Sequence, residues 1–409
     1  MTLRRSAATV LVASAVLCGA AAPMAQADDA SPAGSAAPSA SPSVVIPSGL
    51  YGKKDPKFDG VWRQSLALLA QHTVDVQPAA KAVGWLTAQQ CANGGFASFR
   101  ADPAKPCDDR TLLDTNATAA AVQALDALGG HDTAVRKGAD WLKSVANKDG
   151  GWSYNPGGAS DANSTSVVIG ALAAAGDPTG DAKKVLVSLS IPCDTGPGAG
   201  AFAYQPDKKS KKLYPNADAT GAAVLGALGA GLAPDPGDRD AGGTGCNNAS
   251  MPAQAAHNGA TYLAGATAGK SYLKAEMPGA EDQPDFGNTA DAVTALGADG
   301  LAAQARQPLA WLEQNAASWA KDGGPAAYAQ LIFAAHANKA DPRAFGTTDL
   351  VKGLNATGPA PASLHGSSVQ KQDKSGSSIN IWWIVAIGLV AGIGVGFLMS
   401  MLRGRKRQR

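Results

Sequence analysis

Charge and histidine are both scarce in this chain. Of its 409 residues, 17% are charged, the formal net charge is +2, and five are histidines. Five of the 35 Lys and Arg residues fall in residues 403–409, which is more than the net charge of +2, so the rest of the chain has no basic surplus of the kind that nucleic-acid binding requires. No CxxC pair occurs, and no histidine stands at ligand spacing from a cysteine, which argues against a zinc site. Composition therefore favours neither a nucleic-acid partner nor a metal cofactor.

Uncharged apolar runs occur at the two ends. Residues 1–27 join a basic start, a short apolar stretch and small residues at Ala25 and Ala27, which predicts a signal peptide cut after Ala27. Residues 379–402 are long enough for a transmembrane helix of about 20 residues. The basic residues 403–409 predict a cytoplasmic tail. We expect a single-pass protein of the cell membrane whose amino-terminal domain is extracellular.

Cysteine is limited to five residues, and Cys18 lies in the predicted signal peptide. An even number of cysteines in an exported chain favours disulfides, and four cysteines allow three pairings. We expect one bond within the first pair and one within the second, because each would close a long loop rich in Pro and Gly: Cys91 with Cys107, and Cys193 with Cys246.

Between the ends, composition separates linkers from a folded core. Residues 28–57 are rich in Ala, Ser, Pro and Gly and predict a flexible leader, and residues 357–378 predict a similar stalk. Residues 58–356 are the predicted folded domain, which is longer than most single domains and therefore suggests internal repeats.

Two helical segments alternate through this domain. One type opens with Asp or Asn, which are good helix N-caps, and continues almost wholly in small and apolar residues, as buried helices do. The other type is amphipathic and often carries a Trp-Leu pair, as an outer helix would. We expect inner helices to start near Phe58, Asp114, Asp161, Asp218, Asn288 and Ala326, and outer helices near Pro78, Thr133, Asp181, Gln254, Gln304 and Arg343. Six such pairs are the number expected to close a ring.

The first two pairs resemble the repeat of prenyltransferases and squalene–hopene cyclases. Lys81, Trp85-Leu86, Gln89-Gln90 and Asn93-Gly-Gly-Phe96 follow that pattern, and Arg136, Trp141-Leu142 and Asp149-Gly-Gly-Trp152 form a second copy without the Gln. The resemblance implies an all-α (α/α)6 toroid, a fold shared with protein prenyltransferase subunits, complement thioester domains and cobalamin carriers. The fold does not choose among these functions.

The chemistry of those enzymes finds little support in the residues. The resemblance would require the cyclases' acidic Asp-Asp-Thr-Ala or Asp-x-Asp-Asp run, the prenyltransferases' zinc ligands or the thioester Cys-Gly-Glu-Gln run. None occurs, and the nearest acidic match, Asp108-Asp109, precedes Arg110 in a predicted disulfide loop. We therefore predict no catalytic residues, no metal and no resident cofactor.

Polar and aromatic residues converge on the mouth of the predicted ring, which suits a small-molecule site. The simpler interpretation is that the polar residues are ordinary helix caps and that the aromatics fill turns. The candidate ligand-binding residues are Asp114, Asn116, Trp152, Tyr154, Asp161, Asn163, Phe202, Tyr204, Asp218, Phe286 and Asn288.

Three functions remain open at this point. The first is a non-catalytic surface protein that captures a small molecule, with a corrinoid as one candidate, and presents it to a membrane transporter. The second is a terpene-cyclase-like or prenyltransferase-like enzyme, and the third is a structural or adhesive surface module.

Overall fold

The described part of the chain is almost wholly helical. The computed structural model describes residues 45–238, 245–275 and 283–362. Apart from a 3-10 turn at Pro342–Ala344, its only named elements besides α-helices are two short antiparallel strands, β1 (Leu273–Lys274) and β2 (Pro284–Asp285). The all-α class expected from the sequence is confirmed for these residues.

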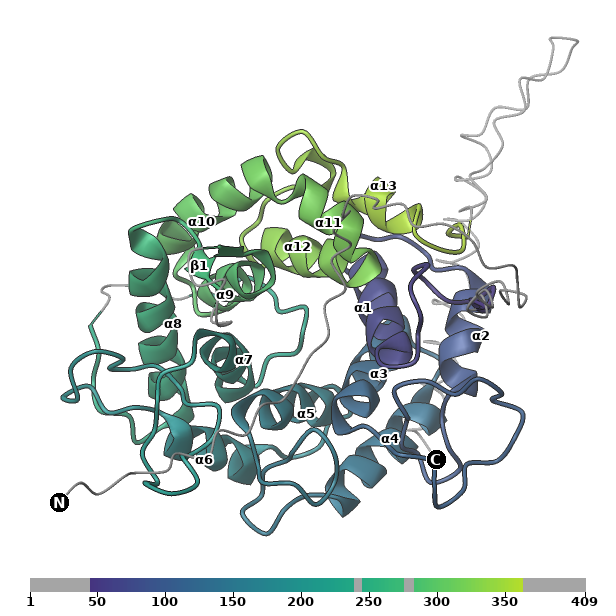
Figure 1. The fold of residues 1–409 in the computed structure, drawn as a ribbon, viewed down its shortest axis with the longest axis horizontal. Helices are drawn as coiled ribbons and strands as arrows, with labels where there is room; N and C mark the ends of the chain where they lie inside the picture. Colours follow the sequence, from purple (N-terminus) through teal and green to yellow (C-terminus); the bar gives the residue numbers. More distant parts are fainter. Residues whose placement is uncertain (1–44, 239–244, 276–282, 363–409) are drawn as a thin grey trace, which may run out of the picture. The chain divides into compact units, whose positions relative to one another are not determined.

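Six mostly buried helices form the inner layer: α1 (Gly60–Thr73), α3 (Thr115–Leu128), α5 (Ala162–Ala174), α7 (Ala217–Leu228), α9 (Phe286–Ala298) and α12 (Pro325–Ala337). They pack in cyclic order, each against the next, and α12 packs against α1. Small residues dominate their buried faces, which allows neighbouring helices to approach closely. Figure 1 shows these helices lying inside the others.

The remaining helices cover the inner layer: α2 (Ala80–Ala88), α4 (Asp132–Ser144), α6 (Gly180–Leu189), α8 (Pro252–Ala268), α10 (Ala302–Asn315), α11 (Ala317–Gly323) and α13 (Leu350–Asn355). Each inner helix packs against the outer helix that follows it, with α11 inserted between α10 and α12. The outer helices bury one stripe each; Trp141 and Leu142 of α4, for example, are buried. The alternation predicted from the sequence is therefore present.

The first and last segments of the core are joined by hydrogen bonds. The Gly52 amide donates to the Thr357 carbonyl at 2.9 Å, and the Tyr51 hydroxyl lies 2.9 Å from the Pro359 carbonyl oxygen. Tyr51 is fully buried although it falls in the segment predicted as a leader. The folded core therefore begins before residue 58, and these contacts join the segment before α1 to the segment after α13.

Three helix starts differ from the prediction. Asn216, not Asp218, caps α7, and Asp285, not Asn288, caps α9. The helix expected near Arg343 is a 3-10 turn there, and α13 starts only at Leu350. The first two errors have one cause: several polar residues stand together at these starts, and only the docking of the preceding loop selects the one that caps the helix.

A Gly-Gly loop is held by the glutamine that precedes it in the repeat. The Gln90 side-chain amide donates to the carbonyl oxygens of Gly94 (3.0 Å) and Ala134 (2.8 Å), which ties this loop to α4. Gly94 has φ of +97°, and a Cβ there would lie 2.0 Å from the Lys137 carbonyl oxygen. Glycine is therefore required at this position by both its backbone conformation and the close approach of α4.

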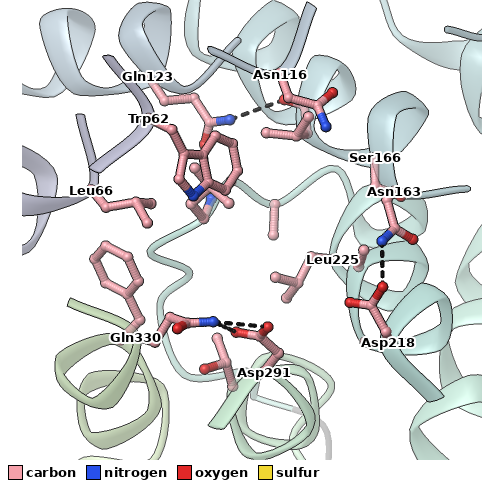
Figure 2. Close-up of a pocket in the computed structure, with 18 of the residues that line it drawn as sticks. Trp62, Leu66, Asn116, Gln123, Asn163, Ser166, Asp218, Leu225, Asp291 and Gln330 are labelled. Carbon is pink, nitrogen blue, oxygen red and sulfur yellow. Dashed lines mark hydrogen bonds between the residues drawn. The ribbon is translucent and has the colours of Figure 1, made fainter. Parts of the chain in front are cut away.

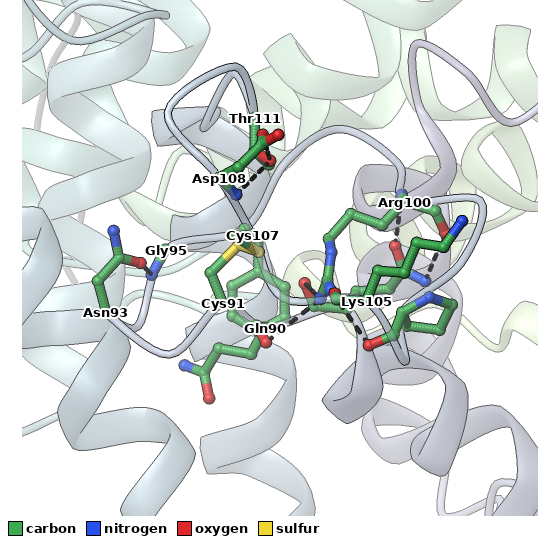
Figure 3. Close-up of a disulfide and its surroundings, with 12 residues drawn as sticks. Gln90, Cys91, Asn93, Gly95, Arg100, Lys105, Cys107, Asp108 and Thr111 are labelled. Carbon is green, nitrogen blue, oxygen red and sulfur yellow. Dashed lines mark hydrogen bonds between the residues drawn. A yellow bond between two sulfur atoms is a disulfide. The ribbon is translucent and has the colours of Figure 1, made fainter.

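Both predicted disulfides are present. Cys91 bonds to Cys107 and Cys193 bonds to Cys246, with Cα–Cα distances of 5.7 and 5.6 Å. Figure 3 shows the first bond beside Gln90 and Arg100, whose backbone amide donates to Oε1 of Gln89 at 2.7 Å. The bond thus closes a loop that is also fixed by hydrogen bonds.

The membrane predictions concern other parts of the chain. No helix among the described residues is both long and apolar enough to span a bilayer. The predicted signal peptide, most of the leader and stalk, the transmembrane helix at 379–402 and the tail lie outside the described residues.

Candidate functional site

Four inner helices begin with the same arrangement. The cap residue is Asp114, Asp161, Asn216 or Asp285, and its side chain accepts a hydrogen bond from the backbone amide three residues later. A threonine always stands four residues after the cap: Thr118, Thr165, Thr220 and Thr289. The threonine oxygen accepts the backbone amide of the incoming loop, at 2.8 to 3.0 Å, from Phe96, Trp152, Phe202 and Leu273 respectively. We call this arrangement the start clasp.

The start clasp accounts for most of the aromatic residues predicted at the mouth. The side chains of Trp152 and Phe202 are buried in the core, and Trp152 Nε1 donates to the Leu142 carbonyl oxygen at 2.7 Å. The Tyr154 carbonyl oxygen accepts from Thr115 N, and the Tyr204 carbonyl oxygen accepts from Ala162 N, both at 3.0 Å. The backbone carbonyls of these tyrosines therefore bind the buried start of the preceding inner helix.

The two tyrosine side chains also lie near the cap carboxylates of those helices. The pKa of Tyr154 is raised by burial and by the nearby Asp114, and the pKa of Tyr204 is raised by burial and by the nearby Asp161. Burial raises the pKa of Asp161, and its hydrogen bond from Ser164 opposes that rise. The carboxylates of Asp114 and Asp161 thus serve as helix caps, as the simpler interpretation of the sequence proposed.

The remaining predicted residues at α9 divide between the clasp and an aromatic stack. The Asn288 side chain donates to the Asp285 carboxylate at 2.8 Å, which strengthens the cap. The Phe286 ring stacks between Trp311 and Trp319, at centroid distances of 4.9 and 5.9 Å.

A cavity of about 240 Å³ lies within the ring of inner helices. It is lined by Trp62, Leu66, Asn116, Gln123, Asn163, Ser166, Val167, Asp218, Gly221, Ala222, Leu225, Ala230, Gly231, Leu232, Asp291, Thr294, Ala326, Gln330 and Phe333. All six inner helices contribute to it. Figure 2 shows Trp62 and Asp218 on opposite sides and Asp291 beside Gln330.

Of the eleven predicted site residues, the structure brings three into this cavity: Asn116, Asn163 and Asp218. Each lies two residues after its cap, in the first turn of α3, α5 or α7. Because the cap and the second residue after it point in different directions on a helix, the cap side chain meets the loop while the later one meets the cavity. Nδ2 of Asn163 donates to the Asp218 carboxylate at 2.7 Å.

Several other residues that line the cavity were not predicted from the sequence. The Gln330 side-chain amide donates to both carboxylate oxygens of Asp291 at 3.1 Å. The Gln123 side chain accepts from Leu232 N at 2.8 Å and donates to the Val167 carbonyl oxygen at 3.0 Å, holding the loop after α7 across one end of the cavity. A Cβ on Gly231 would lie 2.6 Å from Gln123 Oε1, so this loop needs glycine to approach. A charged residue in the middle of an otherwise apolar helix was the available signal for Asp291.

The charged side chains in the described lining of the cavity are acidic. Among the described residues, its lining holds two carboxylates, Asp218 and Asp291, and no Lys, Arg or His. Burial, then the charge of Asp218, raises the pKa of Asp291 to about 7, while burial and the nearby Asp285 raise the pKa of Asp218. The amides that bond these carboxylates are neutral, so within the lining no positive charge balances them.

Comparison with known proteins adds little to this geometry. No protein-family model and no curated protein matches the sequence. Among solved structures, the crystal structure of a protein from Actinoplanes aligns with 71% of this chain and 94% of its own, at 16% sequence identity and a TM-score of 0.48. That likeness is too weak to support any statement about function.

Proposed function

We propose that this protein is an extracellular, membrane-anchored (α/α)6 toroid that binds a small molecule in its central cavity and acts without catalysis. The cyclic packing of six inner helices supports the toroid. The two disulfides support an oxidising compartment. In this proposal residues 379–402 anchor the domain, and the bound molecule passes to a membrane transporter.

The observation that carries the binding proposal is a set of unsatisfied acceptors at the cavity. Oδ1 of Asn116 and Oδ1 of Asn163 are buried, and neither has a hydrogen-bond partner among the described residues. A buried polar atom without a partner costs about 1–3 kcal/mol. A ligand that donates hydrogen bonds to these oxygens would remove that cost.

The size of the cavity restricts the ligand. Its volume of about 240 Å³ lies below the range of about 300–1,000 Å³ that is usual for drug-sized ligands. A corrinoid is larger than this cavity and would have to lie outside it. The proposal therefore favours a smaller molecule.

The cyclase-like alternative needs a strong acid to protonate its substrate. Asp291 is one of the two carboxyl groups of the cavity, but its pKa is raised to about 7. A raised pKa makes a carboxyl group a weaker acid, which is the reverse of what protonation of an alkene demands. The geometry thus favours binding over cyclisation.

Filling the cavity tests the proposed function. Ala222 lines the cavity on α7, so Ala222→Phe should block it, whereas Ala303→Phe adds the same bulk at an exposed position of α10. We expect compounds that raise the melting temperature of the full chain in detergent to lose this effect with Ala222→Phe and to keep it with Ala303→Phe. If no compound from a panel of corrinoids and small metabolites stabilises the chain, or if Ala222→Phe binds as well as the parent, the proposal fails.

A further inference from the structure

Several hydrogen-bond acceptors belong to side chains that line the cavity and have no donor, or fewer donors than they can accept, among the described residues. Asn116 and Asn163 each present an unpartnered Oδ1. Each carboxylate receives one neutral side-chain amide, Asn163 for Asp218 and Gln330 for Asp291, although a carboxylate can accept about four hydrogen bonds. A ligand that fills this site must therefore supply N–H or O–H groups rather than further acceptors.

The negative charge of the cavity lining favours a donor group that is positively charged. Asp218 and Asp291 lie on adjacent inner helices, and a Cβ on Gly221 of α7 would be 3.7 Å from Cβ of Asp291, so the two helices approach closely there. Asp285, at the start of α9, adds a third carboxylate whose charge acts on both. Since no basic side chain lines the cavity in the part of the chain that the structure describes, a cation would supply the missing positive charge.

Two aromatic rings lie among the apolar lining residues. Trp62 projects from α1, opposite Asp218, and Phe333 comes from α12, the helix that also carries Gln330 (Figure 2). Aromatic faces attract cations, and aliphatic carbon packs on the same surfaces. With Leu66, Val167 and Leu225 they offer an apolar wall to the rest of a small ligand.

We propose that the ligand of this cavity is a small protonated alkylamine, whose ammonium group lies between Asp218 and Asp291 and donates to Asn116 or Asn163. An ammonium ion combines the positive charge and the N–H donors that the lining lacks, whereas a quaternary ammonium ion brings only the charge. This inference rests on the proposed function, because it names the ligand class of the same cavity.

Four probes of similar length separate these contributions. Pentylammonium, trimethylpentylammonium, pentanol and pentanoate share the alkyl chain and differ in the charge or hydrogen-bonding capacity of the head group. We expect pentylammonium to bind the full chain at pH 8 at least about tenfold more tightly than each of the others, measured by isothermal titration calorimetry, because each of the others lacks the positive charge, the N–H donors or both. Equal affinity for pentylammonium and pentanoate would overturn the inference.

Variants then locate the ammonium group. Asp218→Asn and Asp291→Asn each keep an oxygen that can accept the existing amide but remove one charge, and we expect each to weaken pentylammonium binding about tenfold or more. Asp109→Asn removes the same charge from an exposed loop position and should leave the affinity unchanged. If the two cavity variants bind pentylammonium as tightly as Asp109→Asn does, the assignment of the carboxylates is wrong.

The pattern of failures distinguishes this inference from the function on which it rests. If pentanol binds, loses affinity in Ala222→Phe, and is not exceeded by pentylammonium, the cavity is a binding site for a neutral ligand and only the cation assignment fails. If no probe binds and no compound in the wider panel stabilises the chain, both fail together.

Discussion

The start clasps and the cavity wall are built from the same helices with nearly the same polar residues, yet they differ in how those residues are satisfied. In the clasps, Asp161 accepts a hydrogen bond from the backbone amide of Ser164, and Thr165 accepts one from the backbone amide of Trp152. In the wall, two residues after each cap, Asn116 and Asn163 leave an oxygen without a partner. The difference teaches that polar groups at one end of a helix divide into those that hold the fold and those left available for a ligand.

The largest expected effect on stability concerns Asp291, a residue of the cavity wall. Its folded pKa of about 7 lies above the ordinary value of 3.8, so the folded state holds this proton more tightly than the unfolded state. Its contribution to stability is therefore full below about pH 4 and is lost as the pH rises towards 7. A pKa difference of that size corresponds to at most about 4 kcal/mol.

Asp291→Asn should therefore raise the free energy of unfolding at pH 8, with a gain that shrinks as the pH falls towards 4. Denaturant titrations of both proteins at pH 4, 6 and 8 measure it. The same variant is expected to lose alkylamine affinity, so a gain in stability would accompany a loss of binding. A variant that is less stable than the parent at pH 8 would show that Asp291 belongs with the structural residues.

The second test breaks a clasp at its cap. Asp161→Ala removes the carboxylate that accepts from Ser164 N at 2.7 Å and leaves a buried helix start without a cap. We expect a loss of about 2–3 kcal/mol in the free energy of unfolding, measured by urea denaturation at pH 7. Asp161→Asn should cost far less, because Asn216 performs the same role in α7. Equal losses in the two variants would contradict the capping role.

The third test removes a single hydroxyl from a clasp. Thr220→Val keeps the shape of the side chain but leaves Phe202 N, now bonded to the threonine oxygen at 2.9 Å, without a partner. We expect the free energy of unfolding to fall by about 1–3 kcal/mol, because that buried amide loses its partner, and we expect ligand affinity to stay unchanged. Thr220→Ser retains the oxygen and serves as the control. Thermal melts of all three proteins measure the effect, and equal melting temperatures for Thr220→Val and the parent would contradict the prediction.

The smallest effect on stability is expected at the wall residue Asn116. Asn116→Ala removes the cost of the unpartnered Oδ1 but also loses the packing of the side chain, and these opposing effects should leave a change of less than about 0.5 kcal/mol in the free energy of unfolding. Calorimetric titration with pentylammonium should nevertheless show weaker binding. A large loss of stability without a loss of affinity would remove the distinction between clasp and wall.

Much of the helical frame could be predicted because it depends on local patterns. The N-caps at Asp114 and Asp161, the Trp-Leu pair of α4 and both disulfide pairings follow from residue type and spacing, and the structure contains all of them. The caps of α7 and α9 were misplaced because Asn216 and Asp285 compete with polar neighbours. The threonine four residues after each cap would have fixed the register, since it recurs in all four helices.

The cavity could not be predicted in the same way. Asn116, Asn163 and Asp218 were chosen as part of a mouth, but Gln123, Asp291, Gln330 and Trp62 lie on helices that are far apart in the sequence. Their convergence depends on the angle at which each helix presents its inner face. No local pattern specifies that angle.

The sequence by itself determined which segments are helical, which of them are buried and where most begin, because these properties follow from apolar periodicity, capping residues and glycine turns. Only the tertiary structure decided which polar side chains are satisfied. The cyclic packing of α1, α3, α5, α7, α9 and α12 brings carboxylates and amide oxygens from separate repeats around one space. Hydrogen bonding and burial depend on neighbours that the chain acquires only on folding, and that dependence turns similar residues into either clasp or wall.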